Sequence, residues 1–194
     1  MQSVCVYCGS SYGTRPEYKV GAAALGKALA EREITLIYGG GRVGLMGTVA
    51  DAVLAAGGKA VGIIPQLLVD KEVAHTALTE LHVVPDMHVR KKQMADMAEG
   101  FIAMPGGGGT LEELFEVFTW AQLGYHDKPI GLLNIEGFYD PLIAMMQHTA
   151  KEGFIRSAYL DLLQSDRDPV ALLDTLRSRG RVTLDKWANG REAV

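Results

Sequence analysis

The sequence has little cysteine, no long apolar run and no excess of basic residues. Only Cys5 and Cys8 are cysteines, too few for a disulfide framework, which indicates a reducing compartment. No uncharged run of about 18 apolar residues predicts a membrane span. The 19 lysines and arginines stand against 23 aspartates and glutamates, and this net charge of −4 argues against a nucleic-acid partner. Since Met1–Val4 also lacks the basic start of a signal peptide, we expect a soluble, cytoplasmic protein.

Glycine, in contrast, is abundant, with 23 residues in a chain of 194. No triplet period accompanies it, so collagen is excluded, and we expect these glycines in turns and where the backbone approaches a ligand. Hydrophobic residues make up 48% and charged residues 22%, as in a globular protein with a sizeable core. The length predicts one domain over residues 1–182, followed by a weakly patterned tail over 183–194 that is expected to fray unless Trp187 anchors it.

Six short apolar runs alternate with helical patterns. The runs are apolar nearly throughout, which is typical of strands covered on both faces of a parallel sheet. The alternation predicts an α/β fold with a doubly wound, mostly parallel sheet, whose ligands bind along the edge formed by the strand C-termini. The stretch from Pro65 to Thr79 is irregular and could cover that edge. The expected strands are Val4–Tyr7, Thr35–Tyr38, Ala60–Ile64, Leu81–Val84, Phe101–Met104 and Pro129–Leu133. The expected helices are Pro16–Arg32, Leu45–Ala56, Met87–Glu99, Leu111–Gly124, Tyr139–Lys151 and Val170–Arg179.

Cys5 and Cys8 form a C-x-x-C pattern in and just beyond the first strand. A redox pair needs a helix N-terminus, and a zinc site needs two more ligands, which the five scattered histidines do not supply. Because their separation is odd, we expect the two thiols on opposite faces of the strand, as buried small hydrophobes. No metal is predicted.

Residues Gly39 to Gly44 match G-x-G-x-x-G between a strand and a helix. This context suits a phosphate or dinucleotide. However, the next strand ends Ile63-Ile64-Pro65 without the acidic residue that holds the ribose of NAD, so an NAD-dependent oxidoreductase is disfavoured. Two interpretations stay open: a turn that passes close to a ligand, or a tight turn whose glycines serve packing.

The strongest signal is the run from Pro105 to Glu113, which follows an apolar strand and opens a helix. Successive glycines can turn several backbone N–H groups toward one anion, and the helix N-terminus adds partial positive charge. No Gly-Lys-Ser/Thr follows, so the run is not a triphosphate P-loop and suits a monophosphate better. Thr110 can cap the helix or donate its hydroxyl to the phosphate.

Glu113 has two interpretations. With Thr110 it spells a capping box, in which the glutamate returns to the N–H of the cap. A carboxylate in the first turn of a phosphate-binding helix also lies where a sugar joined to that phosphate would be.

Helical phase predicts two faces on this helix. One face carries Leu111, Leu114, Phe115, Phe118 and Gln122. The opposite face carries Glu113 and Glu116, with Val117, Trp120 and Leu123 making that side partly apolar. Since a monomer rarely exposes such a face, we expect a subunit interface along this helix.

Arg90 and Lys91 lie near the start of the helix predicted from Met87. At 100° per residue both flank its apolar stripe, whereas Lys92 and Asp96 point away. Charges held against apolar surface need partners, so this pair favours a cleft that holds an anion over a solvated surface.

Together, Pro105-Gly-Gly-x-Gly-Thr-x-x-Glu113 and Met87-x-x-Arg90-Lys91 resemble the LOG (Lonely Guy) family of cytokinin-activating phosphoribohydrolases. The similarity runs from Cys8-Gly9-Ser10-Ser11 to about Ser165. It implies a Rossmann-like fold, a homodimer with active sites at the subunit interface, and hydrolysis of the N-glycosidic bond of N6-modified adenosine 5′-monophosphates. Bacterial members also cleave AMP. The family implies no cofactor, and no lysine here suits pyridoxal phosphate.

The resemblance implies a catalytic pair, Arg90 and Glu113. At Gly108 many members carry a larger side chain, a position at which the pattern is permissive. A different class of function would use the same glycine-rich, anion-binding turn before Thr110, called the cradle below. Molybdenum-cofactor carriers hold a phosphorylated pterin without hydrolysing it. The implied substrate contacts are Glu72, Arg90, Lys91, Gly107, Gly108, Gly109, Thr110, Leu111, Glu112, Glu113 and Thr119.

Overall fold

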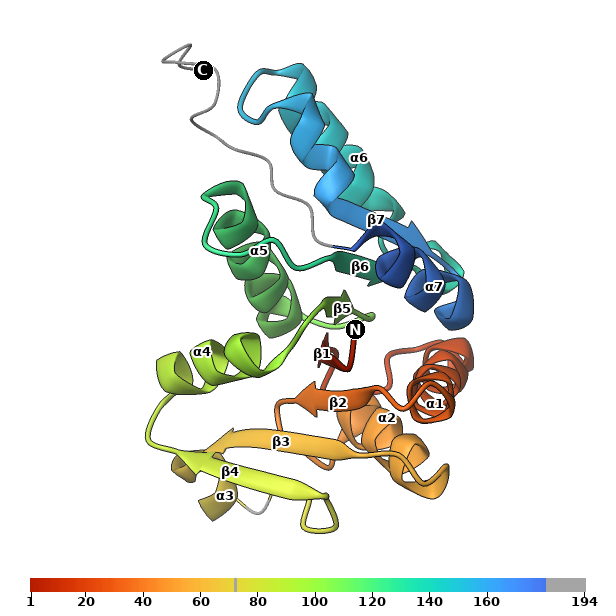
Figure 1. The fold of residues 1–194 in the computed structure, drawn as a ribbon, viewed down its shortest axis with the longest axis vertical. Coiled ribbons are helices and arrows are strands. Elements are labelled where there is room, and N and C mark those ends of the chain that lie inside the picture. Colours follow the sequence, from red (N-terminus) through yellow and green to blue (C-terminus); the bar gives the residue numbers. More distant parts are fainter. Residues whose placement is uncertain (72, 181–194) are drawn as a thin grey trace.

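The computed structural model describes residues 1–71 and 73–180, which contain one seven-stranded sheet (Figure 1). The strand order is β4-β3-β2-β1-β5-β6-β7, and every neighbouring pair is parallel. The predicted doubly wound α/β fold is therefore confirmed. The strands are β1 (Ser3–Tyr7), β2 (Thr35–Tyr38), β3 (Ala60–Pro65), β4 (Glu80–Val84), β5 (Phe101–Ala103), β6 (Ile130–Leu133) and β7 (Leu163–Asp166).

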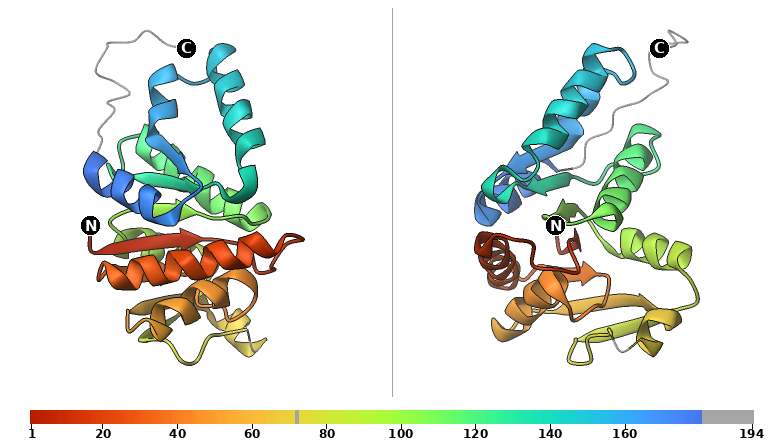
Figure 2. Two further views of the ribbon diagram at one scale, coloured as in Figure 1. Left: turned by 90° about the vertical axis from the view of Figure 1, so that its right-hand side faces the viewer. Right: turned by 180° about the vertical axis from the view of Figure 1, so that it is seen from behind.

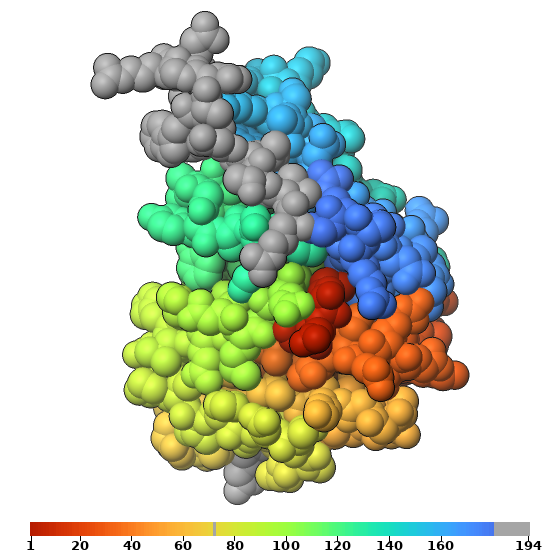
Figure 3. All heavy atoms as spheres, in the orientation of Figure 1, coloured from red at the N-terminus to blue at the C-terminus, as the bar shows by residue number. Residues whose placement is uncertain are grey.

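Helices cover both faces of the sheet, as Figures 1 and 2 show. Helices α1, α2 and α7 lie on one face and α4 and α5 on the other, while α6 projects away from the sheet. In the space-filling view the first residues of the chain, in red, reach the surface between the α4 and α1 segments (Figure 3). The α-helices are α1 (Pro16–Glu31), α2 (Gly44–Ala55), α3 (Gln66–Asp70), α4 (Met87–Met97), α5 (Gly108–Gln122), α6 (Asp140–Lys151) and α7 (Pro169–Arg179), with 3-10 turns at Ile135–Gly137 and Ser157–Leu162.

Because the inner strands are covered on both faces, the core falls into two clusters of buried side chains. Cys8 belongs to the cluster beneath α1, α2 and α7, and Cys5 to the one beneath α4 and α5. The expected placement on opposite faces is confirmed. Both thiols are free, and burial raises the pKa of each far above its usual value, so they act as small hydrophobes. Within the described ranges no group of three or more His, Cys, Asp or Glu could hold a metal ion.

The six predicted strands are confirmed to within one residue at each end. Among the strands and α-helices described, two were not predicted. Strand β7 (Leu163–Asp166) is a half-exposed edge strand with one apolar residue, so it lacks the pattern of a buried strand. Helix α3 lies in the stretch expected to be irregular, and none of its five residues is buried.

The order of the sheet reverses between β1 and β5, since β2 to β4 lie on one side and β6 and β7 on the other. Ligands of open α/β sheets bind beyond the carboxyl ends of the strands at such a reversal. Here the loops after β1 and β5 meet, because the Gly9 N–H donates to the Pro105 carbonyl at 3.0 Å. Among the described helices, none is long and apolar enough to cross a bilayer.

Candidate functional site

Helix α5 begins at Gly108, three residues before the predicted start at Leu111. Its N-cap is Gly107, which makes no side-chain cap, and the Leu111 N–H donates to the Gly107 carbonyl at 3.1 Å. Thr110 is thus inside the first turn, and the capping box of Thr110 with Glu113 is wrong. Glycine is unfavourable inside a helix, so the residue pattern predicted a helix start after the glycines. An N-cap accepts glycine, and the helix in fact begins among them.

Gly107, Gly108 and Gly109 leave open space at the start of α5. All three are exposed, and a Cβ added to any of them would meet no protein atom within 4 Å. The first N–H groups of a helix lack intrahelical acceptors and carry partial positive charge. Packing within the described chain does not require these glycines, and they leave the start of α5 open to solvent. Gly106 differs, because a Cβ there would overlap Thr110 Oγ1.

The predicted pair Arg90 and Glu113 lies beside this turn. Arg90 Nη1 donates to Glu113 Oε1 at 2.9 Å, and the side chains are only 9% and 12% exposed. Arg90 Nε also donates to the Ile63 carbonyl at 3.1 Å, near the carboxyl end of β3. Residues 23 positions apart in the sequence therefore form one buried ion pair between α4 and α5.

The surroundings of Glu113 shift the pKa of its carboxyl group in opposing directions. Burial raises its pKa above the usual 4.5, and the nearby Glu112 charge adds to this. The charge of Arg90 and its hydrogen bond lower the pKa but do not offset the burial. Any displacement of the guanidinium would consequently raise the pKa of Glu113 further.

Lys91 forms a second link between α4 and α5. Its Nζ donates to Glu112 and, at 3.0 Å, to Glu116, and these hydrogen bonds raise its pKa. Arg90 and Lys91 are both largely buried, as expected, and the anions that they contact are carboxylates of α5. Lys92 is exposed, as predicted, and pairs with Asp96 on the outer face of α4.

One further predicted contact, Thr119, does not join this pair. Thr119 is exposed on α5, six residues after Glu113, or about 9 Å along the helix axis. Seven residues from Glu112, it lies on the same face as that residue. Glu72 and the tail from residue 183, with Trp187, lie outside the described residues.

The core face of α5 differs from the prediction. Val117 is buried, whereas Phe115 and Leu123 are 37% and 40% exposed. The grouping of Phe115 with Leu114 and Phe118 is therefore wrong, as is the placement of Val117 on the opposite side. The exposure of Leu123 agrees with its predicted place on the second side. The helix packs on β1 and β5 and also contacts the Ser157–Leu162 turn, so the buried stripe is rotated from the one that sequence phase alone indicates.

The glycine turn after β2 is closely packed. A Cβ on Gly44, whose φ is +60°, would overlap the backbone carbonyl carbon of Ser10, and one on Gly47 would overlap the carbonyl oxygen of Arg42. The Leu45 N–H donates to the Gly9 carbonyl at 3.1 Å. The sequence left two interpretations of this turn, close approach to a ligand or a tight turn whose glycines serve packing. These contacts support the second.

The same turn is tied to the segment after α3. The Arg42 N–H donates to the Val73 carbonyl at 2.9 Å, and the His75 N–H donates to the Gly40 carbonyl at 2.8 Å. Part of the stretch from Pro65 to Thr79 thus lies at the carboxyl edge of β2, where the sequence suggested that it could.

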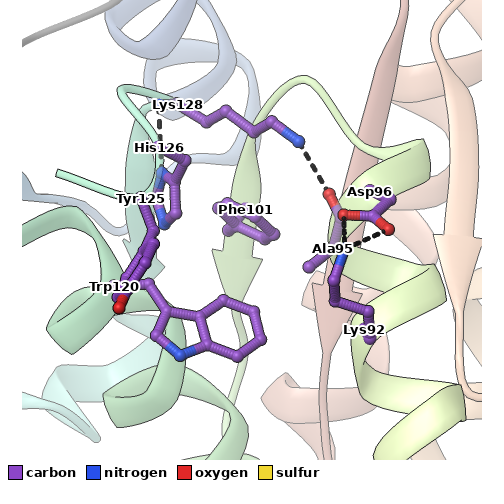
Figure 4. Close-up of a pocket in the computed structure, with 8 residues that line it drawn as sticks. All are labelled: Lys92, Ala95, Asp96, Phe101, Trp120, Tyr125, His126 and Lys128. Carbon is purple, nitrogen blue, oxygen red and sulfur yellow. Dashed lines mark hydrogen bonds and ion pairs between the residues drawn. The ribbon is translucent and has the colours of Figure 1, made fainter. Parts of the chain in front are cut away.

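A cavity of about 320 Å³ lies between the C-terminal halves of α4 and α5, far from the carboxyl edge (Figure 4). Its polar groups contact one another: the Lys128 ammonium donates to the Ala95 carbonyl at 2.7 Å, and His126 Nδ1 accepts from the Lys128 N–H. None of the predicted substrate contacts within the described ranges lines it. The lining residues are Lys92, Ala95, Asp96, Phe101, Trp120, Tyr125, His126 and Lys128.

Fold and site together define a Rossmann-like α/β protein with an open glycine turn at a helix start, beside a buried arginine–glutamate pair. The family model described as "Possible lysine decarboxylase" matches residues 46–176. The chain belongs to the LOG family, as its relatives at about 50% identity show and as its motifs predict.

Two relatives illustrate this similarity. A rice protein (Oryza sativa subsp. japonica) named probable cytokinin riboside 5′-monophosphate phosphoribohydrolase LOGL2 is 48% identical over 173 residues, 89% of this chain and 71% of its own. The Arabidopsis thaliana cytokinin riboside 5′-monophosphate phosphoribohydrolase LOG1 is 51% identical over 152 residues, 78% of this chain and 71% of its own.

Solved structures share the fold at low identity. The molybdenum cofactor carrier protein of Chlamydomonas reinhardtii has a TM-score of 0.69 and 21% identity, covering 91% of this chain and 98% of its own. The molybdenum cofactor binding protein of Rippkaea orientalis has a TM-score of 0.70 and 20% identity, and the match covers 91% of this chain and 96% of its own. At this identity the likeness concerns the fold alone.

Proposed function

We propose that this protein hydrolyses the N-glycosidic bond of N6-modified adenosine 5′-monophosphates, including cytokinin riboside 5′-monophosphates, and that AMP is a further substrate. The products are the free base and ribose 5-phosphate. The observation that carries this proposal is the open turn Gly107–Gly109 beside the buried pair of Arg90 and Glu113. The names of the relatives support the same reaction.

In this proposal the turn holds the 5′-phosphate. The N–H groups of Gly107, Gly108 and Gly109 point toward the phosphoryl oxygens, the dipole of α5 adds positive charge, and Thr110 can donate its hydroxyl. A ribose attached to that phosphate then lies next to the first turn of α5, where Glu113 is. One phosphoryl group fills the cradle, so a 5′-monophosphate is the preferred ligand.

Cleavage passes through a state in which the sugar carries positive charge. The bond between C1′ and the base nitrogen breaks, and a water oxygen bonds to C1′. One water proton passes to Glu113, which then releases it to solvent, and the leaving base takes up one proton from solvent, so that the enzyme returns to its starting state. The carboxylate of Glu113 offsets the charge on the sugar and orients the water. Arg90 acts electrostatically, keeping Glu113 ionised and contacting the nucleotide, because a guanidinium does not give up its proton near neutral pH.

The proposal includes a homodimer with active sites near the interface. Two exposed apolar side chains, Phe115 on α5 and Leu123 at its C-cap, would be covered by a second copy. Thr119 lies on the same exposed part of the helix, away from the Arg90–Glu113 pair of its own chain. It is therefore available to the site of the partner.

A carrier of a phosphorylated ligand is the alternative, since the same cradle would hold a pterin phosphate without hydrolysis. Incubation with AMP and isopentenyl-AMP, followed by chromatography for free base, separates the two. Nucleosides and their di- and triphosphates serve as controls. Release of base from the monophosphates alone supports the proposal. Sustained absence of base, with a pterin co-purifying, would establish the carrier instead.

A further inference from the structure

We infer that Gly39 is a positioning residue for Arg90: its missing side chain leaves the space through which the guanidinium reaches Glu113. The inference rests on the proposed function for its catalytic consequence, though not for its geometry. It assigns a role to the first glycine of the turn after β2, which the proposed substrate contacts do not include.

The guanidinium lies directly over Gly39. A Cβ at this position would overlap Arg90 Nη2 and lie 3.0 Å from Cζ and 3.5 Å from Nε. The other edges of the guanidinium are occupied, since Nε donates to the Ile63 carbonyl and Nη1 to Glu113. With Arg90 only 8% exposed, an added methyl group cannot be accommodated by a small shift of the guanidinium into solvent.

Both backbones that form this contact are fixed. The first turn of α4 is capped by Asp86, whose carboxylate accepts from the N–H groups of His88 and Val89 at 2.8 and 2.9 Å. Gly39 follows β2 directly, and Gly40, with a φ of +71°, accepts from the His75 N–H. The guanidinium is the flexible partner, so a methyl group at Gly39 should displace it and leave the fold intact.

Displacement of the Arg90 guanidinium should change the pKa of Glu113, which a purely structural role of Gly39 would not do. Both the charge and the hydrogen bond of Arg90 lower the pKa of Glu113 against the effect of burial. Moving the guanidinium away should raise that pKa and shift the acidic limb of the activity profile upward. The charged or titratable groups that interact electrostatically with Glu113 are Arg90 and Lys91 from α4, Glu112 from α5, and Cys5, Tyr7 and Cys8 from β1 and its end.

The test is Gly39→Ala, with Gly41→Ala as the matched control. Gly41 belongs to the same turn, and its added Cβ would also meet the end of a flexible side chain, the methyl group of Met46 at 2.8 Å. The pKa of Glu113 is measured by carbon NMR on protein labelled at glutamate, without substrate. Melting temperature and the kcat and KM for isopentenyl-AMP are measured in parallel.

We expect Gly39→Ala to stay folded, to raise the pKa of Glu113 and to lower kcat at least tenfold, while Gly41→Ala stays close to the parent protein. In an Arg90→Ala background Gly39→Ala should have no further effect. A folded Gly39→Ala protein with the pKa of Glu113 unchanged would overturn the inference. A shifted pKa in Gly39→Ala, together with a parent protein that hydrolyses no nucleotide, would support the inference and refute the proposed function.

If Gly39→Ala does not fold, a double variant with Arg90→Ala shows whether the conflict is with Arg90 or with the backbone. A folded Gly39→Ala/Arg90→Ala protein would show that the methyl group conflicts with Arg90, as inferred. An unfolded double variant, beside a folded Arg90→Ala protein, would show that Gly39 serves the backbone instead and would overturn the inference.

Discussion

Two glycine-rich turns lie at the carboxyl edge of this sheet, and their surroundings differ. After β2, a Cβ at Gly39, Gly44 or Gly47 would overlap protein atoms. After β5, a Cβ at any of Gly107–Gly109 would meet nothing within 4 Å. Both turns follow a strand and open a helix, so sequence alone does not separate them. The atoms around the missing side chain distinguish a glycine required by packing from one that leaves room for a ligand.

The largest expected effect is at the open turn. Glu113→Gln should keep the fold and lower kcat by about 10²- to 10⁴-fold, since general acid–base catalysis contributes in that range. The amide keeps an acceptor for Arg90 but loses the charge. Steady-state kinetics with isopentenyl-AMP measure the loss, and Asp96→Asn, on the exposed face of α4, is the control expected to retain full activity. A Glu113→Gln protein as active as the parent would remove the carboxylate from the mechanism.

In the closely packed turn after β2, a substitution should lower the free energy of unfolding. Gly44→Ala places a methyl group against Ser10 at a φ of +60°, so strain and overlap together should destabilise the fold by about 2–4 kcal/mol. Urea denaturation followed by circular dichroism gives the change. An unaltered midpoint would mean that this turn is not held as the structure shows.

The open turn should respond in the opposite way. Gly109→Ala replaces glycine in the first turn of a helix, so the free energy of unfolding should stay the same or rise by up to about 1 kcal/mol. The methyl group would occupy the cradle, and KM for a 5′-monophosphate should rise about tenfold, or about 1.4 kcal/mol of lost binding. Thermal unfolding and initial-rate kinetics test the two parts. Lost stability with an unchanged KM would show that Gly109 serves packing.

The smallest effect concerns pH. Since the reaction needs ionised Glu113 and burial raises its pKa in the free protein, the acidic limb of kcat/KM should lie above the usual carboxyl value of 4.5. The same shift makes ionisation costly for the fold. The free energy of unfolding should therefore fall as pH rises from the unfolded pKa of Glu113 through its folded pKa. Glu113→Gln should lack this fall. A limb at or below the ordinary value would contradict the assignment.

Periodicity and glycine placement predicted the sheet, whereas the pairing of Arg90 with Glu113 was implied only by the resemblance to the LOG family. They missed β7, whose edge position needs no apolar run, and they placed the start of α5 too late, because glycine was not expected to be helical. Val117 was assigned to the wrong side because contacts with the Ser157–Leu162 turn reset the buried face of α5. The overlap of Gly39 with Arg90 depends on tertiary distances that local sequence does not carry.

The most direct test is a crystal structure of the Glu113→Gln protein with isopentenyl-AMP bound. The phosphate should accept hydrogen bonds from the N–H groups of Gly107–Gly109, with C1′ of the ribose beside residue 113 and Arg90. A phosphate bound at the Gly39–Gly44 turn, or a nucleotide lodged in the cavity between α4 and α5 with the open turn unoccupied, would contradict the account.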